Sequence, residues 1–216
     1  MRIARITLQG ILWAALCVLT INQAQAGNTY NESTSTDLSN NQAAPTSFSL
    51  TSGTNPVIGN VGAAVGDMQD WIAVSVPSGF QLSSLILHSY ISNDVQGFTG
   101  FQAGSAFSGN PQTAPSAYEG YTHFGTAAQN GVLAAVNLVG QDLLPVMANP
   151  ADAPGSQGFT PPLAAGTYTF LVQQSGASTS YEFDFGVTAV PEPASLGLMG
   201  LAGAALLAVA FRRRKQ

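Results

Sequence analysis

The most constraining feature of this 216-residue chain is that all six of its basic residues lie at the two ends. No lysine or arginine occurs between Ile6 and Phe211, and this stretch holds all eleven acidic residues. The body between the ends is therefore purely anionic. Because a body without cations cannot neutralise phosphates, nucleic acid is excluded as a partner.

Residues 1–26 have the three parts of a secretory signal peptide. Arg2 and Arg5 form the positive start, residues 11–19 form the apolar middle, and Ala24-Gln25-Ala26 is a small-x-small cleavage site. We therefore expect a signal peptidase to cut after the second of these alanines. An uncleaved membrane anchor is the alternative, but the apolar run is short for a membrane span.

A second apolar segment, residues 194–211, lies near the C-terminus. A helix of this length would reach roughly 27 Å, at about 1.5 Å per residue, which suffices to cross a membrane. Basic residues at a membrane edge mark its cytoplasmic side, so the anionic body is expected outside. The basic cluster that follows the segment consists of Arg212, Arg213, Arg214 and Lys215.

Residues 190–196 stand directly before this segment and begin Val190-Pro191-Glu192-Pro193. The two prolines fix φ and push their predecessors toward extended backbone, so the piece presents one carboxylate in a stiff, strand-like conformation. Such a piece suits a protease that binds extended substrates. The succession of Pro-Glu-Pro, apolar span and basic cluster over residues 190–216 resembles the PEP-CTERM sorting signal.

The resemblance implies that exosortase, a multi-spanning membrane cysteine protease, processes the chain at or near Pro191-Glu192-Pro193. It further implies transfer to the outer surface or exopolysaccharide matrix of a Gram-negative bacterium. It covers only about the last 27 residues and describes sorting rather than the work of the sorted domain. A plain C-terminal membrane anchor with an extended linker is the alternative.

Residues 46–189 predict an all-β domain, because short alternating or aromatic-rich runs are separated by turn residues. No long amphipathic helix interrupts them, which favours an antiparallel β-sandwich or jelly roll. Gly176 lies between the last two predicted strands and predicts a hairpin. The predicted strands are 47–50, 71–76, 82–91, 168–173 and 181–187.

The remaining segments are less regular. Residues 27–45 are polar and predict a flexible lead-in or a loosely attached first strand. Residues 102–129 are rich in Gly, Ala, Ser and Pro and predict a long loop. Residues 130–147 fit either one short helix or a strand.

Two stretches of the body resemble bacterial pre-peptidase C-terminal domains. Residues 66–79, GDMQDWIAVSVPSG, are similar to that family's D-x-x-D-W stretch, and residues 163–170, LAAGTYTF, are similar to its late L-x-x-G-T-Y strand. The resemblance spans roughly 46–188, with a large insertion between the two motifs. It implies a secreted, jelly-roll-like β-sandwich that is non-catalytic and takes part in binding or folding.

Motifs of known catalytic mechanism are missing from the sequence. It contains neither Gly-x-Ser-x-Gly nor His-Glu-x-x-His, and its one cysteine, Cys17, lies in the predicted signal peptide. His88 and His123 have no spacing that suggests metal ligation. The body also offers no lysine or arginine to orient a substrate. We therefore predict no catalytic residue and no resident cofactor.

Asp67 and Asp70 are the candidate metal ligands, because two carboxylates in a Gly-flanked loop of an anionic domain could bind Ca²⁺. Asp94, Asp142 or Asp152 could add ligands. The alternative, that these aspartates only cap turns, is favoured by the lack of a complete EF-hand pattern.

The sequence thus predicts a non-catalytic surface or matrix protein, with a glycan- or calcium-binding module as the alternative. A secreted hydrolase is a third possibility that no motif supports. Sugar binding needs exposed aromatic side chains, and the candidates are Tyr90, Tyr118, Tyr121 and Trp71. Of these, Trp71 is expected to pack in the core, as strand aromatics usually do.

Overall fold

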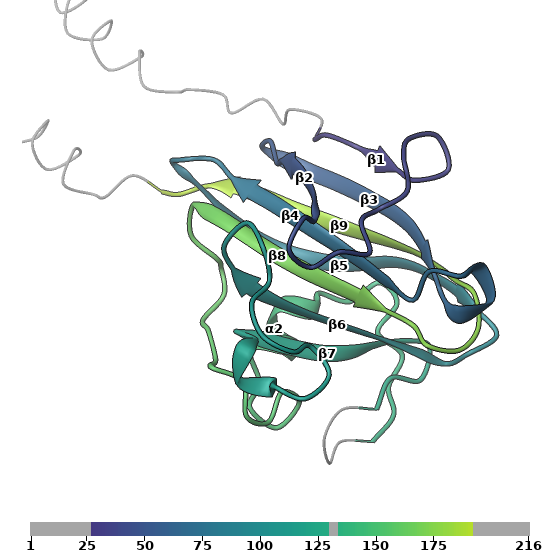
Figure 1. The fold of residues 1–216 in the computed structure, drawn as a ribbon. Coiled ribbons are helices and arrows are strands. Elements are labelled where there is room, and N and C mark those ends of the chain that lie inside the picture. Colours follow the sequence, from purple (N-terminus) through teal and green to yellow (C-terminus); the bar gives the residue numbers. More distant parts are fainter. Residues whose placement is uncertain (1–26, 130–133, 192–216) are drawn as a thin grey trace, which may run out of the picture.

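The computed structural model describes residues 27–129 and 134–191 (Figure 1). The predicted signal peptide, apolar span and basic cluster, together with Glu192 and Pro193 of the motif, lie outside these residues. Among the described residues, no helix has the length and apolar character needed to span a membrane.

Two β-sheets stacked on one another make up the fold (Figure 1), which confirms the predicted all-β sandwich. The four-stranded sheet has the order β1 (Tyr30–Asn31), β3 (Gly53–Val61), β9 (Thr179–Ala189) and β5 (Phe80–Ser92). The five-stranded sheet has the order β2 (Thr46–Ser49), β4 (Gln69–Val76), β8 (Gly166–Gln173), β6 (Gln96–Ala103) and β7 (Gly120–Gly125). The short helices in the described connections are η1 (Ala63–Val65), η2 (Pro115–Ala117) and α2 (Leu143–Met147).

The main core lies between the two sheets because the strands alternate apolar and polar side chains. On β9, Tyr181, Phe183 and Phe185 are buried while the residues between them are only half-buried, as the sequence predicts. Phe170 of β8 packs against Phe185 with ring centroids 5.3 Å apart. Each fully buried side chain of this size stabilises the fold by roughly 1.5–3 kcal/mol.

The hairpin predicted around Gly176 is wrong, because β8 and β9 belong to different sheets. β8 pairs with β4 and β6, whereas β9 pairs with β3 and β5. Both strands carry a large apolar face, and stacking the two faces buries more apolar area than placing them edge to edge. The connection at residues 174–178 therefore crosses from one sheet to the other.

The sandwich is also not purely antiparallel. The strands β1 and β3 pair in parallel, as do β2 and β4. The first four strands alternate between the two sheets, so the chain returns to each sheet running in its earlier direction.

The segment 27–45, predicted as a flexible lead-in, is instead part of the domain. Leu38 is only 2 % exposed and belongs to the core. The backbone N–H of Trp71 donates to the carbonyl of Ser39 at 2.7 Å, and the N–H of Asn28 donates to the side chain of Asn55 at 3.0 Å. Polar residues here bond to the sandwich, which composition alone does not reveal.

The prediction of one long loop over residues 102–129 is wrong for its later part, because residues 120–125 form the edge strand β7. The part before it covers the outer face of the five-stranded sheet. There Phe107 and Tyr118 pack on Trp71 and Leu171 in a second, smaller apolar cluster. A Cβ at Gly100 would clash with the Tyr118 ring, so glycine permits this covering. For the undecided 130–147 segment, residues 143–147 form the helix α2.

Candidate functional site

A buried carboxylate joins the two sheets. Asp70 on β4 is 0 % exposed, and its Oδ2 accepts a hydrogen bond of 2.7 Å from the Tyr181 hydroxyl on β9. The tyrosine crosses Gly59 of β3, where a Cβ would clash with its hydroxyl. The second oxygen, Asp70 Oδ1, is buried without a hydrogen-bond partner. Burial raises the pKa of Asp70 to about 8, although the Tyr181 bond opposes the rise.

Asp67, the second predicted ligand, lies in the turn between η1 and β4. Gly66 has φ +82°, a left-handed conformation that turns the chain there. Asp67 Oδ1 accepts from the N–H of Gln69 at 3.3 Å, whereas Oδ2 is buried without a partner. Burial is the main cause that raises the pKa of Asp67.

Glu32, which sequence analysis did not single out, completes the group. It follows β1, and its two oxygens accept from the N–H of Leu38 at 3.1 Å and the N–H of Asn60 at 2.6 Å. Burial first, and then the hydrogen bond with the Asp37 side chain, raises the pKa of Glu32 to about 7. No local pattern marks Glu32, because its place depends on the pairing of β1 with β3, far along the chain.

These residues form what we call the acidic pocket, defined as Glu32, Asp37, Asp67 and Asp70. Carboxylate oxygens of Glu32, Asp67 and Asp70 all lie within 4.8 Å of one another. Glu32, Asp37 and Asp67, together with Asn60, line an open pocket of about 470 Å³, whereas Asp70 is buried beside them. The structure therefore brings the two predicted ligands together and adds a third.

The other candidate ligands lie elsewhere. Asp142 caps α2 and accepts from the N–H groups of Leu85 at 2.9 Å and Leu144 at 3.1 Å. Asp94 accepts from the N–H of its neighbour Val95, and Asp152 accepts from the Asn149 side chain. None of these three aspartates belongs to the group formed by Glu32, Asp67 and Asp70, and two of them make the local turn and cap bonds of the alternative interpretation.

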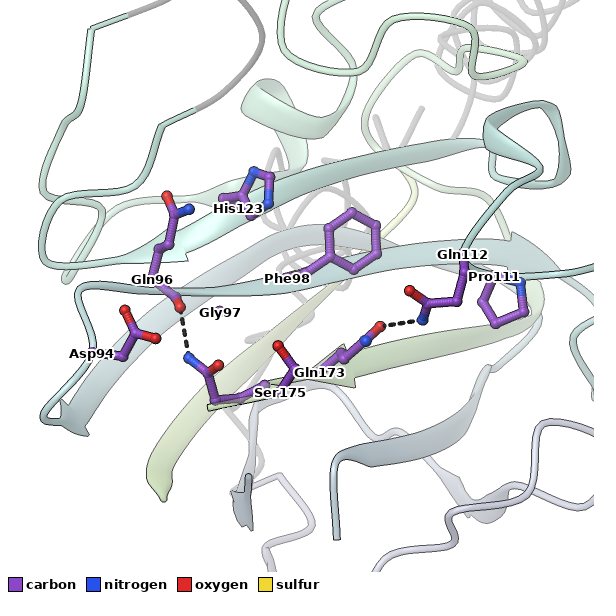
Figure 2. A pocket seen from close by; sticks show the side chains of 10 residues that line it. Asp94, Gln96, Gly97, Phe98, Pro111, Gln112, His123, Gln173 and Ser175 are labelled. Carbon is purple, nitrogen blue, oxygen red and sulfur yellow. Dashed lines mark hydrogen bonds between the residues drawn. The ribbon is translucent and has the colours of Figure 1, made fainter. Parts of the chain in front are cut away.

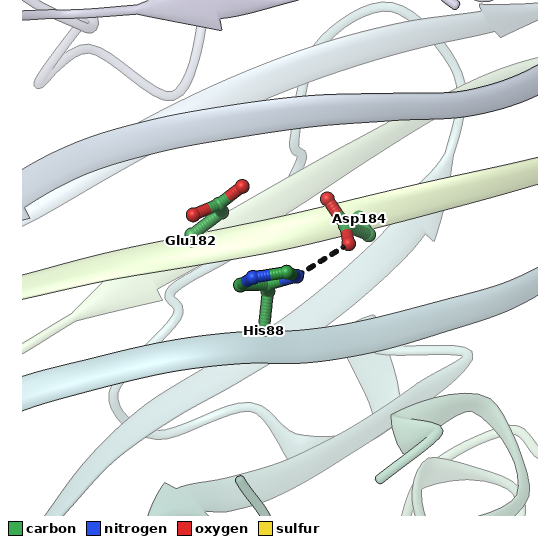
Figure 3. A group of neighbouring side chains, drawn as sticks. All are labelled: His88, Glu182 and Asp184. Carbon is green, nitrogen blue, oxygen red and sulfur yellow. Dashed lines mark hydrogen bonds and ion pairs between the residues drawn. The ribbon is translucent and has the colours of Figure 1, made fainter. Parts of the chain in front are cut away.

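A second group with metal-ligand side chains lies on the outer face of the four-stranded sheet (Figure 3). His88 on β5 points toward Glu182 and Asp184 on β9, and its Nδ1 lies 2.9 Å from Asp184 Oδ2. The His88 side chain is 58 % exposed. The bond to Asp184, followed by the charges of Glu182 and Asp184, raises the pKa of His88.

A polar groove of about 370 Å³ lies beside β6 (Figure 2). Phe98 and Gln96 of β6, His123 of β7 and Gln173 of β8 line it, and Gln112 closes one side from the loop. Its walls are tied by hydrogen bonds, including one of 2.9 Å from Gln112 Nε2 to Gln173 Oε1. The groove thus presents amide groups beside an aromatic ring.

The predicted sugar-binding aromatics do not gather in one exposed surface. Trp71, as expected, is buried, and so are Tyr90 and Tyr118. Tyr121 is half-buried, with its ring centroid 5.7 Å from that of Phe98 in the groove. Sequence reasoning missed Phe98 because it predicted no strand over residues 96–103, where β6 forms.

The described part of the tail begins directly at the sandwich. β9 ends at Ala189, and the N–H of the next residue, Val190, donates to the carbonyl of Gly79 at 2.9 Å. Val190 and Pro191 are both exposed. The first residues of the predicted sorting motif therefore leave the last core strand without a linker.

The comparisons agree with the sequence at this end of the chain. Residues 189–215 match the family model described as the PEP-CTERM protein-sorting motif. No curated protein and no solved structure matches the chain. The resemblance of the body to pre-peptidase C-terminal domains gains no support. The motif marks a chain that is exported and then processed by exosortase, a membrane protein, before release at the surface.

Proposed function

Because the chain carries the PEP-CTERM protein-sorting motif, we propose that it is a non-catalytic protein of the surface or exopolysaccharide matrix of a Gram-negative bacterium. In this proposal a signal peptidase removes residues 1–26. Residues 194–211 then hold the domain in the inner membrane until exosortase cuts near Pro191-Glu192-Pro193. The observation that carries the proposal is the motif match at residues 189–215.

The fold supports this order of events. The sandwich is complete at Ala189, so a cut at the triplet would leave all of its strands intact. The hydrogen bond from Val190 to Gly79 places the motif at one end of the sandwich. With the predicted span starting at residue 194, that end would face the membrane. The protein's work would then be done by the released anionic domain.

The test is to express the full chain in a host that contains the sorting protease, with and without Pro191→Ala, Glu192→Ala and Pro193→Ala combined. We expect mass spectrometry to show a shortened C-terminus, and fractionation to show release from the inner membrane, both lost in the triple variant. A Glu119→Ala chain is the matched control and should be processed normally. Unchanged cutting and release of the triple variant would refute the proposal.

The polar groove supports a second candidate function, binding of a glycan of the matrix. Sugars present hydroxyls that pair with amides and a C–H face that packs on an aromatic ring, and the groove offers Gln96, Gln112 and Gln173 beside Phe98. In a pull-down with purified exopolysaccharide, we expect Phe98→Ala and Gln173→Ala to reduce binding. His88→Ala, on the other sheet, should leave it unchanged. Equal binding by all three variants would exclude the groove as the site.

A further inference from the structure

Among residues 27–129 and 134–191, no lysine or arginine is present to balance the four carboxylates of the acidic pocket. The chain has no lysine or arginine between Ile6 and Phe211. Of the two histidines, His88 bonds to Asp184 on the outer face of the four-stranded sheet, and His123 lies on β7. Since the described part of the chain supplies no such charge, we infer that it comes from solution, either as protons or as a metal cation.

Two carboxylate oxygens of the pocket could bind such a cation. Asp70 is wholly buried, and Tyr181 occupies only its Oδ2, so that Oδ1 has no hydrogen-bond partner. Asp67 Oδ2 is also buried without a partner. Buried polar atoms are almost always paired, because an unpaired one loses its hydration without compensation. The two unpaired carboxylate oxygens therefore indicate a ligand that accepts lone pairs, as a metal cation does.

The spacing of the carboxylates fits one hard cation. Ca²⁺ takes six to eight oxygens at about 2.3–2.6 Å, so oxygens in one coordination shell lie at most about 5 Å apart. Oxygens of Glu32, Asp67 and Asp70 lie within 4.8 Å of one another. The open pocket lined by Glu32 and Asp67 leaves room for water ligands on that side. We propose that Glu32, Asp67 and Asp70 bind one Ca²⁺ ion.

The ion would hold separate parts of the fold together. Glu32 belongs to the N-terminal segment beside β1 of the four-stranded sheet, whereas Asp70 lies on β4 of the five-stranded sheet. Asp67 comes from the turn that leads into β4. A bound ion would thus bridge the two sheets and fix the N-terminal segment, and it would become available when the chain reaches the calcium-containing exterior.

The first measurement is calorimetric titration of the full chain, purified in detergent, with Ca²⁺. We expect one site with a Kd on the order of 10⁻⁴–10⁻³ M, the range of extracellular calcium modules. Millimolar Ca²⁺ should raise Tm by several degrees relative to a chelator, and Mg²⁺ should raise it less, because Mg²⁺ demands a tighter octahedral shell. Absence of both heat and Tm change would overturn the proposal and leave protons as the balancing charge.

Variants then locate the ion. Asp67→Asn and Asp70→Asn should each weaken Ca²⁺ binding at least tenfold. Asp70→Asn should still fold, because its amide oxygen can accept the Tyr181 hydrogen bond. Asp184→Asn, which removes the same charge on the other sheet, is the matched control and should bind as the unaltered chain does. Binding that survives both pocket variants, or that is lost equally in the control, would contradict the site.

A spectroscopic test separates ligation from a general effect on folding. The Tyr181 hydroxyl bonds to Asp70, so Tb³⁺ replacing Ca²⁺ would lie close to an aromatic donor. We expect Tb³⁺ luminescence excited through tyrosine, which Ca²⁺ displaces and which Asp67→Asn lacks. Luminescence that is the same in Asp67→Asn would place the ion elsewhere.

Discussion

The acidic pocket and the His88 group, defined as His88, Glu182 and Asp184, both bring carboxylates together but in different surroundings. In the His88 group, a carboxylate has a histidine at 2.9 Å, and the histidine is largely exposed to water. In the acidic pocket, Asp70 is wholly buried and its partner is the neutral hydroxyl of Tyr181. The number of carboxylates is therefore a poor guide to a site. The pocket is distinguished by the complete burial of Asp70 and by the lack of a histidine, lysine or arginine partner among the described residues.

A single strand supplies both groups. On β9, Tyr181 faces the core and reaches Asp70, while the neighbouring Glu182 and Asp184 face outward toward His88. The alternation of a strand thus places one polar contact in the core and another on the outer face of the sheet, where the His88 side chain is 58 % exposed and that of Asp184 is 14 % exposed.

The largest expected effect comes from removing the hydroxyl that serves Asp70. Tyr181→Phe leaves a buried carboxylate oxygen without its donor, so we expect the free energy of unfolding in chelator to fall by about 1–3 kcal/mol. Urea unfolding measures this. Tyr168→Phe is the control, because the Tyr168 hydroxyl donates to the Ala164 carbonyl at an exposed position. This substitution should lower the free energy of unfolding by no more than about 0.5 kcal/mol. An equal decrease in unfolding free energy in Tyr181→Phe and Tyr168→Phe would mean that the burial of Asp70 does not increase the cost of losing its hydrogen bond.

A smaller effect is expected at Glu32, which holds two backbone N–H groups. Glu32→Gln keeps one oxygen as an acceptor but places its NH2 group, a donor, against the other backbone N–H. We therefore expect the free energy of unfolding to fall by about 0.5–1.5 kcal/mol. Hydrogen exchange should become faster at the amides of Leu38 and Asn60. Glu182→Gln, in the exposed group, should change neither stability nor exchange there. Unchanged protection of Leu38 and Asn60 would show that the N-terminal segment is held by other contacts.

The features that could be predicted from the sequence are those that depend on residues close together along the chain. The alternation around Phe183 and Phe185 predicts both the strand and its buried face, and the order of residue types at the C-terminus predicts the sorting motif. The pairing of Asp67 with Asp70 is likewise local, because a short turn and the start of β4 carry both.

What the sequence does not predict depends on contacts between distant segments. Glu32 meets Asp67 only because β1 joins the edge of β3, in register Tyr30↔Val57. Gly176 predicts a hairpin, whereas the chain changes sheet there because β8 and β9 pair with different distant strands. The strand β7 pairs with β6, and its residues Tyr121, Thr122 and Phe124 favour a strand, but the Gly-, Ala-, Ser- and Pro-rich composition of residues 102–129 as a whole predicts a loop.

The smallest expected effect is a pH dependence at His88. The bond to Asp184 and the charge of Glu182 raise the pKa of His88, so protonation favours the folded state. Its stabilising contribution is present below the unfolded pKa of about 6.5 and is lost as the pH rises through the folded value. The buried acids Asp70 and Glu32 change stability in the same direction over this range, so the difference between the unaltered chain and His88→Gln isolates the histidine.

We expect the urea midpoints of the unaltered chain and of His88→Gln, measured across this range, to converge at high pH, with the unaltered chain higher only at low pH. NMR titration of His88 should show a raised pKa that Asp184→Asn brings back toward 6.5. A midpoint difference that is constant with pH would show that the exposed pair is not a source of stability.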